Sequence, residues 1–266
     1  GIKTVYNLAK SMDTTWELCL QNDVGVAVNI AEAALDAGVE RLVYTGTIAS
    51  YDMSNEAVSI TENSEFGDDM SDRNLYARSK AECERRLMQM HKDRDLPLTI
   101  ARPGIVIGPG GPLQHWGIGR WHGAGAVRLW SAGNNKLPFV LIDDVSDGLV
   151  RMAEVPEAIG QTFNLVGDIQ FTAREYFDAI YEGLGARVKV KGGNPTVFWA
   201  FDAVKHVLKK HALRRHGVLR PSLMDWKSRA HFSPFINTKS KELLGWVPES
   251  DRAKFVEKGI LDANLL

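Results

Sequence analysis

Cysteine is scarce in this chain, and no long hydrophobic run occurs. Cys19 and Cys83 are the two cysteines among 266 residues. They form no Cys-x-x-Cys pair, so neither a disulfide framework nor a zinc site is expected. No run of about 18 apolar residues is present, so no transmembrane span is predicted, and no signal peptide is recognisable. These absences favour a protein of the reducing cytoplasm.

An excess of charge of either sign is also absent. The 32 basic residues are balanced by 33 acidic ones, which argues against a general nucleic-acid binder. Histidines stand at positions 206, 211 and 216, but residues five apart on a helix point in different directions, so no metal site is predicted. The chain starts with Gly1 rather than methionine, and we expect the native protein to have a segment before it.

Short apolar runs alternate with longer helical patterns in the first half. Strands and helices are predicted there at residues 2–8, 16–37, 41–45, 75–92 and 98–101. This alternation favours right-handed βαβ units in a parallel sheet. Residues 104–140 have no clear period. After them, strands are predicted at 138–142, 162–166 and 187–190, and helices at 143–153, 172–183, 195–215, 239–244 and 250–260.

The segment Tyr76-Ala-Arg-Ser-Lys80 carries the clearest chemistry. On a helix, Tyr76 and Lys80 are i,i+4 neighbours on one face. An ammonium beside a phenol stabilises the phenolate, so that the tyrosine can accept and donate a proton near neutral pH. The same spacing at Tyr6 and Lys10 falls on a predicted strand, where residues four apart stand about 13 Å apart. An exposed helix face is the other reading of Tyr76 and Lys80.

A hydroxyl that completes this chemistry follows the predicted strand at 41–45. Thr47 stands two residues after that strand, where its side chain could hold a substrate oxygen against Tyr76. A Thr-Tyr-Lys set handles the proton of an alcohol or carbonyl while a nicotinamide handles the hydride.

Further motifs follow one another along nearly the whole chain. They are Val5-Tyr-Asn-Leu-Ala9, Asn22-x-x-Gly25, Tyr44-Thr-Gly-Thr47 with Tyr51, Tyr76-x-x-x-Lys80, Arg102-Pro-Gly104 with Gly108-Pro-Gly110, Pro138 to Val145, and Leu243-Leu-Gly-Trp-Val-Pro248. In this order they resemble the extended short-chain dehydrogenases/reductases of the NAD-dependent epimerase/dehydratase type. The resemblance implies an α/β fold, with a Rossmann-like doubly wound parallel sheet and a smaller C-terminal α/β substrate lobe.

The same resemblance implies a division into domains. Residues 1–110 are expected to form a partial dinucleotide-binding domain to which 143–168 return. The substrate-binding lobe is expected at 111–142 and 169–266.

Roles for individual residues also follow from the resemblance. Tyr76 is expected to be the general acid/base, supported by Lys80, Thr47 and Asn22. NAD or NADP is expected along Leu8, Ala9, Thr45, Tyr76, Lys80, Pro103 and Ile105. The substrate is expected against Thr47, Ile105, His115 and Trp116. Two other readings stay open, a helix-surface amide for Asn22 and ordinary core packing for the tryptophan.

One departure from the family concerns the start of the chain. The family begins with a strand and a Gly-rich turn that cradles the cofactor pyrophosphate at a helix N-terminus, and nothing before Ile2 supplies them. We therefore expect about 60 residues, two βαβ units, to be missing. The strand at 2–8 would then be an open sheet edge, and this chain alone would bind a dinucleotide weakly.

A second departure concerns the substrate. Ile105 stands where family members that act on nucleotide-sugars often carry Asn, yet the segments Tyr44–Ser50 and His115-Trp-Gly resemble bacterial members of polysaccharide clusters. We expect an NAD(P)-dependent oxidoreductase or epimerase acting on a sugar-nucleotide or a related hydroxyl or carbonyl compound. The alternatives are a hydroxysteroid- or dihydroflavonol-type carbonyl reductase, and a truncated, non-catalytic scaffold without cofactor.

Two kinds of partner besides a small-molecule substrate are considered. The helices at 16–37 and 75–92 are expected to pair in a homodimer, as is common in the family. The helix at 195–215 is basic, with aromatic residues near its start. A solvated helix is its simplest reading, and contact with an anionic membrane surface is the alternative.

Overall fold

Four parallel strands form the main sheet of the computed structural model, which describes residues 1–67, 70–123, 125–214 and 218–263. Their order is β1-β2-β3-β8, and their bounds are Thr4–Asn7, Arg41–Thr45, Leu98–Pro103 and Thr162–Leu165. The predicted α/β fold with a parallel sheet is confirmed. β1 lies at an edge of this sheet, as expected, although the strand is shorter than the predicted 2–8.

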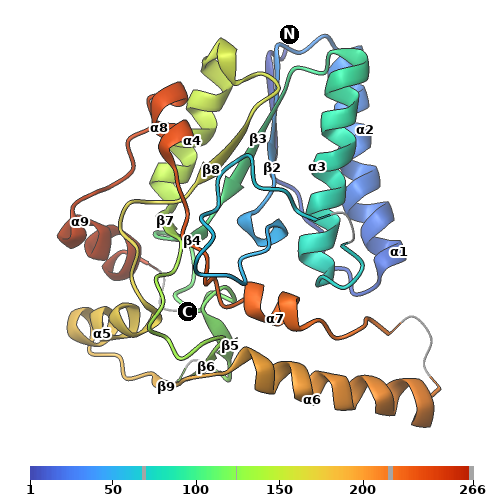
Figure 1. Ribbon diagram of the computed structural model, residues 1–266. Coiled ribbons are helices and arrows are strands. Elements are labelled where there is room, and N and C mark those ends of the chain that lie inside the picture. The colour runs from blue at the N-terminus through green and yellow to red at the C-terminus, as the bar shows by residue number, and fades with distance from the viewer. Residues whose placement is uncertain (68–69, 124, 215–217, 264–266) are drawn as a thin grey trace.

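Helices cover both faces of the sheet (Figure 1). On one face lie α1 (Trp16–Cys19), α2 (Val26–Asp36) and α3 (Leu75–Arg94). A π-helical stretch, Leu20–Gly25, joins α1 to α2, so the predicted helix at 16–37 is one continuous element. The other face carries α4 (Ile142–Glu154) and α8 (Thr238–Leu244).

The alternation of side chains along β2 accounts for this two-sided arrangement. Leu42 and Tyr44 pack with α2 and α3, whereas Val43 between them packs with α4 and α8. Successive side chains of a strand point to opposite faces, and a parallel sheet needs cover on both. The run of buried residues in β2 therefore produces the doubly wound layering.

A smaller lobe is built around a second set of strands. A three-stranded sheet has the order β5-β6-β9, with bounds Gly119–Trp121, Ala126–Leu129 and Lys189–Lys191. β4 (Ile105–Ile107), which the sequence did not predict, pairs in parallel with β7 (Phe139–Leu141). This short pair leads from the main sheet into the lobe, because β4 follows β3 after one residue.

The helices of the lobe are α5 (Ala173–Leu184), α6 (Pro195–Val207), α7 (Leu223–Ser228) and α9 (Arg252–Val256). The Thr172–Glu175 capping box at the start of α5 is present, with bonds in both directions. α6 continues as a π-helical stretch, Leu208–Ala212. Position 215 of the predicted helix and His216 lie outside the described residues.

The division into domains stays a prediction. α8 falls within the range assigned to the lobe, yet its Leu244 packs with Val43 and Leu165 of the main sheet. Within the described ranges, no helix is both long and apolar enough to cross a membrane. No three His, Cys, Asp or Glu side chains of those ranges gather as metal ligands would.

Candidate active site

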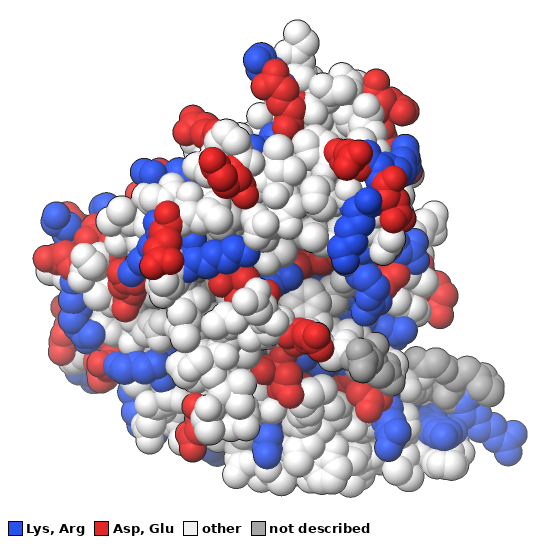
Figure 2. Space-filling model, turned by 45° about the horizontal axis from the view of Figure 1, so that its top comes forward, with Lys and Arg blue, Asp and Glu red and all other residues white. Residues whose placement is uncertain are grey.

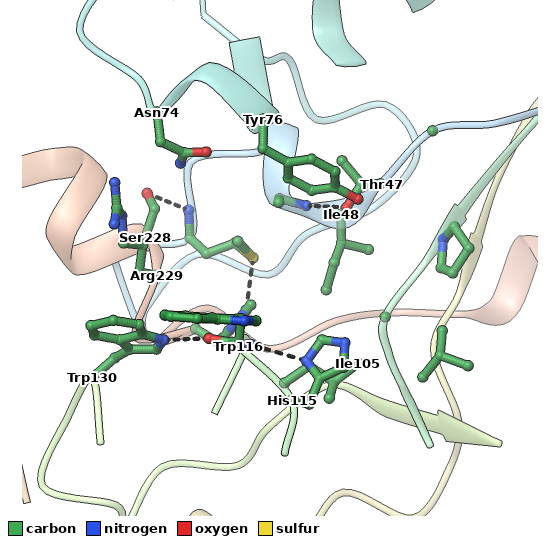
Figure 3. A pocket seen from close by; sticks show the side chains of 18 of the residues that line it. Thr47, Ile48, Asn74, Tyr76, Ile105, His115, Trp116, Trp130, Ser228 and Arg229 are labelled. Carbon is green, nitrogen blue, oxygen red and sulfur yellow. Dashed lines mark hydrogen bonds between the residues drawn. The ribbon is translucent and has the colours of Figure 1, made fainter. Parts of the chain in front are cut away.

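A cavity of about 580 Å³ lies where the main sheet meets the lobe. Its sheet-side wall is formed by residues 45–49 at the end of β2, by 73, 74 and 76 at the start of α3, and by 103–106 at the end of β3. Residues 115–117, 130, 228, 229 and 231 form its lobe-side wall (Figure 3). In open α/β sheets, ligands bind beyond the carboxyl ends of the strands, which is where this cavity lies.

The cavity brings together Tyr76 and Thr47. Asn74 caps α3 by accepting a hydrogen bond from Ala77 N at 3.1 Å, which places Tyr76 in the first turn. The Tyr76 side chain is 43% exposed and its ring points toward Thr47 (Figure 3). Thr47 is buried, and its Oγ1 accepts from Ala49 N at 3.1 Å. Both proposed proton-handling hydroxyls therefore lie in one wall.

Lys80 lies one turn further along α3, under this wall. Its side chain is buried, at 4% exposure, and its Nζ donates to the Thr45 carbonyl at 2.7 Å. The Nζ also lies 4.9 Å from the centre of the Tyr44 ring. Burial lowers the pKa of the Lys80 ammonium below its usual value. The lysine thus ties the helix to the end of β2 and places a cation beneath the cavity.

A second lysine lies close to Tyr76, and the sequence did not suggest it. Lys10 Nζ is 5.8 Å from the centre of the Tyr76 ring and forms an ion pair with Asp23 at 2.7 Å. Ser11 N also donates to Asp23 at 2.7 Å. Burial alone would raise the pKa of Asp23, but the hydrogen bonds from Lys10 and Ser11 outweigh burial and hold it below its usual value. Asp23 therefore remains a carboxylate that fixes Lys10.

Four of the expected residues do not line the cavity: the buried Lys80 beneath it, and Asn22, Leu8 and Ala9. Asn22 is exposed, and its amide donates to the Asp13 carboxylate at 2.9 Å, which fits its reading as a helix-surface amide. Its neighbour Asp23 is the buried side chain of that turn. Leu8 and Ala9 follow β1 and are exposed. Their roles stay predictions.

The expected substrate residues Ile105, His115 and Trp116 all line the cavity. Burial lowers the pKa of the His115 imidazole, and its Nδ1 accepts from Gly117 N at 2.9 Å. The Trp116 carbonyl accepts from the indole of Trp130 at 2.6 Å, and its own ring is exposed. His115 and Trp116 therefore give the lobe-side wall an aromatic surface with a neutral imidazole, and Ile105 adds an aliphatic side chain from the sheet-side wall.

Sequence reasoning missed a buried ion pair that joins the two walls. Arg73, 1% exposed, donates from Nε to Asp225 at 3.1 Å and from Nη2 to the carbonyls of Ala49 and Tyr51. Asp225 also accepts from Asn74 and Arg229. Burial tends to raise the pKa of Asp225, yet the guanidinium groups of Arg229 and Arg73 hold it below its usual value. A span of 152 residues separates the pair, so no local spacing signals it.

His231 was likewise missed. It is buried, lines the cavity and has a left-handed backbone, with φ of 52°. Burial lowers its pKa to about 4, helped by His115, so the ring is neutral near pH 7. The Asn135 side chain holds this segment by donating to the carbonyls of Ala230 and His231, at 2.7 and 3.0 Å.

Beneath the cavity, a second buried ion pair supports the strand ends. Arg102 donates to Glu84 and to the Tyr51 hydroxyl, and Tyr51 donates to Asn164 at 3.0 Å. Gly46 lies against this pair, since a Cβ there would come within 2.1 Å of a Glu84 oxygen. The glycine of the Thr-Gly-Thr segment is therefore required by a close approach of side chain to backbone.

The expected cofactor residues Thr45, Tyr76, Pro103 and Ile105 all line the sheet-side wall. Thr45 lines the cavity, and its Oγ1 is buried without a partner among the described residues. Such an atom calls for a polar ligand group. Tyr76 and the segment 103–105 add polar and apolar surface to the same wall.

A protein-family model and several known proteins are similar to this chain. The model of the NAD dependent epimerase/dehydratase family matches residues 1–166, and the resemblance stated above is thereby confirmed. The UDP-glucose 4-epimerase of Vibrio cholerae is 31% identical over 154 residues, 57% of this chain and 46% of that protein. The UDP-glucose 4-epimerase of Mycolicibacterium smegmatis is 26% identical over 246 residues, 90% of this chain and 67% of that protein.

A third relative has a different printed activity. The 3beta-hydroxysteroid-dehydrogenase/decarboxylase isoform 2 of Arabidopsis thaliana is 25% identical over 263 residues, 93% of this chain and 46% of that protein. The chain therefore spans about half the length of two of these relatives and about two thirds of the third.

Solved structures show the same fold. The crystal structure of gox2253 has a TM-score of 0.77 and 20% identity, and the match covers 98% of this chain and 78% of that one. The UDP-glucuronic acid 4-epimerase of Bacillus cereus, in complex with UDP-glucuronic acid and NAD, has a TM-score of 0.68 and 16% identity, with coverages of 98% and 75%.

Proposed function

The chain belongs to the NAD dependent epimerase/dehydratase family, and from that premise we propose that it acts as an NAD(P)-dependent enzyme on a nucleotide-sugar. The reaction is the reversible oxidation of a substrate hydroxyl, as in an epimerisation. The observation that carries the proposal is the placement of Tyr76 and Thr47 in one cavity wall, with the buried Lys80 below them.

Proton transfer belongs to Tyr76 in this proposal. Its phenolate accepts the proton of the substrate hydroxyl and returns it in the reverse step. Lys10 lies 5.8 Å from the ring centre, and Lys80 stands one helical turn further along α3. In this proposal their positive charges assist the proton transfer at the ring oxygen. Lys80 has three N–H donors, of which the Thr45 carbonyl takes one.

Thr47 orients the reacting oxygen. Its Oγ1 accepts from Ala49 N, and its hydroxyl hydrogen can still be donated to a substrate oxygen. Thr47 and Tyr76 line the same wall. In this proposal, a substrate oxygen bound by Thr47 therefore lies next to the Tyr76 ring.

A bound NAD or NADP supplies the hydride acceptor and donor. Thr45, Pro103 and Ile105, together with Tyr76 and Lys80, are the residues proposed to hold its nicotinamide and ribose. Asn22, Leu8 and Ala9 lie outside the cavity wall, so we assign them no contact with the nicotinamide.

A polar substrate is favoured by Arg73. Its Nη1 is buried in the cavity wall without a partner among the described residues. A substrate with acceptor oxygens satisfies such a donor, whereas a hydrocarbon surface leaves it unpaired at a cost of about 1–3 kcal/mol. Two of the curated relatives are named UDP-glucose 4-epimerases, which agrees with this preference.

A second candidate is a hydroxysteroid-type dehydrogenase. Much of the cavity wall is apolar, with Ile48, Met53, Ile105 and Trp116 among its residues. The Arabidopsis thaliana relative, named for a hydroxysteroid activity, aligns with 93% of this chain. This candidate requires that a flat apolar substrate fills the cavity beside Arg73.

Product analysis separates the candidates. The full-length protein is incubated with NAD and either UDP-glucose, UDP-galactose or a 3-hydroxysteroid, and the products are separated by chromatography. Interconversion of the UDP-sugars without net NADH supports the proposal. Steroid oxidation with accumulating NADH supports the second candidate. If no substrate reacts and calorimetry detects no NAD binding, the non-catalytic scaffold is the remaining reading.

A further inference from the structure

The helix α6 carries its apolar side chains on its outward face. Phe198 faces inward, where its ring packs at 5.8 Å from Trp130 and 5.3 Å from Trp226. His206 also faces inward, with Nδ1 at 3.1 Å from the Leu219 carbonyl. The opposite face therefore points to solvent, and there lie Val197, Phe201, Val204 and Leu208, which we call the outward stripe.

The spacing of the outward stripe is that of one helix face. Its members stand at i, i+4, i+7 and i+11, the period of a continuous stripe along a helix. Phe201 is 64% exposed, Val204 60% and Leu208 55%. A helix that packs on its own protein normally shows the reverse pattern, with polar residues outward. The stripe thus has no partner within the described part of the chain.

Basic residues border the outward stripe. Lys205 and Lys209, both exposed, each follow a stripe residue by one position and lie at the flank of the stripe that borders the groove with His206. Lys210 and Arg214 continue the basic character beyond it. No acidic residue occurs between positions 203 and 214. Figure 1 shows α6 projecting beyond the body of the protein, and Figure 2 shows blue side chains gathered at its projecting end.

We propose that the outward face of α6 and of the π-helical stretch after it docks on an anionic lipid bilayer surface. Helices of this kind lie in the plane of the interface, with the apolar side buried among the acyl chains and the cations among the headgroups. The outward stripe provides the apolar side, and Lys205, Lys209, Lys210 and Arg214 provide the charge that complements anionic headgroups.

The small size of the stripe argues against a second copy of the chain as its occupant. A stable protein interface takes about 20–30 residues from each partner, whereas the stripe has four. A bilayer accepts a narrow helix face because it deforms around each side chain, and the flanking lysines snorkel to the headgroups. Helix α6 also contacts the cavity wall, because Phe198 on its inward face packs on Trp130. Docking of the outward face on a bilayer therefore leaves the cavity close to the membrane surface.

Vesicle binding tests the proposal with the full-length protein. Sedimentation with phosphatidylcholine vesicles, with and without phosphatidylglycerol, is compared at low and high salt. We expect binding to the anionic vesicles, weaker binding at high salt, and little binding to phosphatidylcholine alone. The double variant Lys205→Glu, Lys209→Glu should weaken binding at least 25-fold, about 5-fold for each lysine removed from the surface. The control exchanges two exposed lysines elsewhere, Lys92→Glu and Lys254→Glu.

The apolar part of the stripe is tested by Phe201→Ser with Leu208→Ser, with Val247→Ser as the exposed apolar control. We expect a loss of binding of more than about tenfold for the former and no change for the control. Equal binding to both lipid compositions, or binding unaffected by either double variant, overturns the proposal. So does a change of oligomeric state in the Ser double variant by ultracentrifugation, which would identify a second copy as the occupant.

A site-specific label provides a direct readout. Cys19 and Cys83 are buried, so a Phe201→Cys variant can be labelled selectively with an environment-sensitive dye. A blue shift of its emission with anionic vesicles, and none with a Val247→Cys label, is the expected result. An unshifted emission from position 201 in vesicle-bound protein shows that another surface makes the contact.

Discussion

The two walls of the cavity are held in different ways. On the sheet side, the bonds that fix Thr47 and the start of α3 are local, from Ala49 two residues on and from Ala77 to Asn74 three residues back. The longer bond there, from Lys80 to the Thr45 carbonyl, spans 35 residues. On the lobe side, the bonds span the chain. Arg73 pairs with Asp225, and Ser228 accepts from Met53 N at 3.2 Å across 175 residues. Hydrogen bonds between residues close in sequence depend on the local segment, whereas those between distant residues depend on the complete tertiary fold.

The two walls therefore differ in their expected roles, proton transfer on the sheet side and closure of the cavity over the substrate on the lobe side. The residues proposed for proton transfer lie on the locally held wall, where one substitution changes the reaction without disturbing the fold. The residues that close the cavity from the lobe are also those that hold the lobe to the sheet. Their substitution is expected to lower the stability of the fold first, whereas substitution on the sheet-side wall is expected to lower turnover first.

The largest effect is expected at Tyr76. Tyr76→Phe removes the hydroxyl proposed to carry the proton, and turnover should fall by about 10²–10⁴-fold. The side chain is partly exposed, so the thermal midpoint should stay within a degree or two. Steady-state turnover of the full-length protein and thermal melting are the measurements. Tyr6→Phe, at the other Tyr-x-x-x-Lys spacing, is the matched control and should retain turnover. A Tyr76→Phe enzyme as active as the wild type would remove Tyr76 from the mechanism.

The lobe-side wall should respond in stability. Asp225→Ala leaves the buried guanidinium of Arg73 without its carboxylate, which costs about 3–5 kcal/mol in the free energy of unfolding. Denaturant titration measures the loss. Asp147→Ala, which breaks the exposed pair with Arg151, is the control and should cost about 1 kcal/mol or less. Equal losses for the two variants would show that the Arg73–Asp225 pair does not hold the walls together.

The sequence revealed the locally held half of the molecule well. The parallel sheet and the helices that cover it follow from periodicity, which local residues determine. Thr47 and Tyr76 line one cavity with Lys80 buried beneath it, and their catalytic roles stay predictions. β4 was missed because three apolar residues after Pro103 carry no period of their own. Asp225 and His231 were missed because their partners lie far along the chain. Asn22 was expected at the site by resemblance, yet the π-helical stretch turns Asp23 inward instead.

The pH dependence of stability should report on His231. Its pKa in the folded protein is lowered to about 4, against about 6.5 in the unfolded chain. Between these values the unfolded chain binds the extra proton, so stability is complete above about pH 6.5 and falls as the pH drops toward 4. The loss amounts to about 3 kcal/mol. His231→Asn, which tolerates the left-handed backbone, should flatten this part of the profile. The exposed His122→Asn is the control. An unchanged profile in His231→Asn would assign the acid sensitivity to other groups.

The outer face of the sheet-side helices is expected to form the homodimer interface. Val26 of α2 is exposed although it is apolar, as is Leu18 of α1. Val26→Arg should weaken self-association by more than about tenfold, because it buries an unpaired charge twice in a symmetric contact. Sedimentation velocity of the full-length protein over a range of concentrations measures this. Val247→Arg, on another exposed apolar residue, is the control. A wild-type protein that stays monomeric at micromolar concentration contradicts the predicted dimer.

The smallest effect is expected at Lys10, and it decides which lysine serves Tyr76. The Lys80 ammonium is bound to the Thr45 carbonyl, whereas Lys10 lies 5.8 Å from the centre of the Tyr76 ring and is anchored by Asp23. A cation over an aromatic face contributes about 0.5–1 kcal/mol at a partly exposed site, so Lys10→Met should lower turnover only about 2- to 5-fold. Lys80→Met removes the buried charge and the link to β2 together, and should cost at least about 100-fold. Turnover and the pH dependence of turnover are measured for both variants and for Lys3→Met, an exposed lysine paired with Glu40. If Lys10→Met lowers turnover as much as Lys80→Met, the cation that assists Tyr76 is Lys10, from the segment after β1. The sheet-side wall would then depend on a residue outside the Tyr76-x-x-x-Lys80 motif.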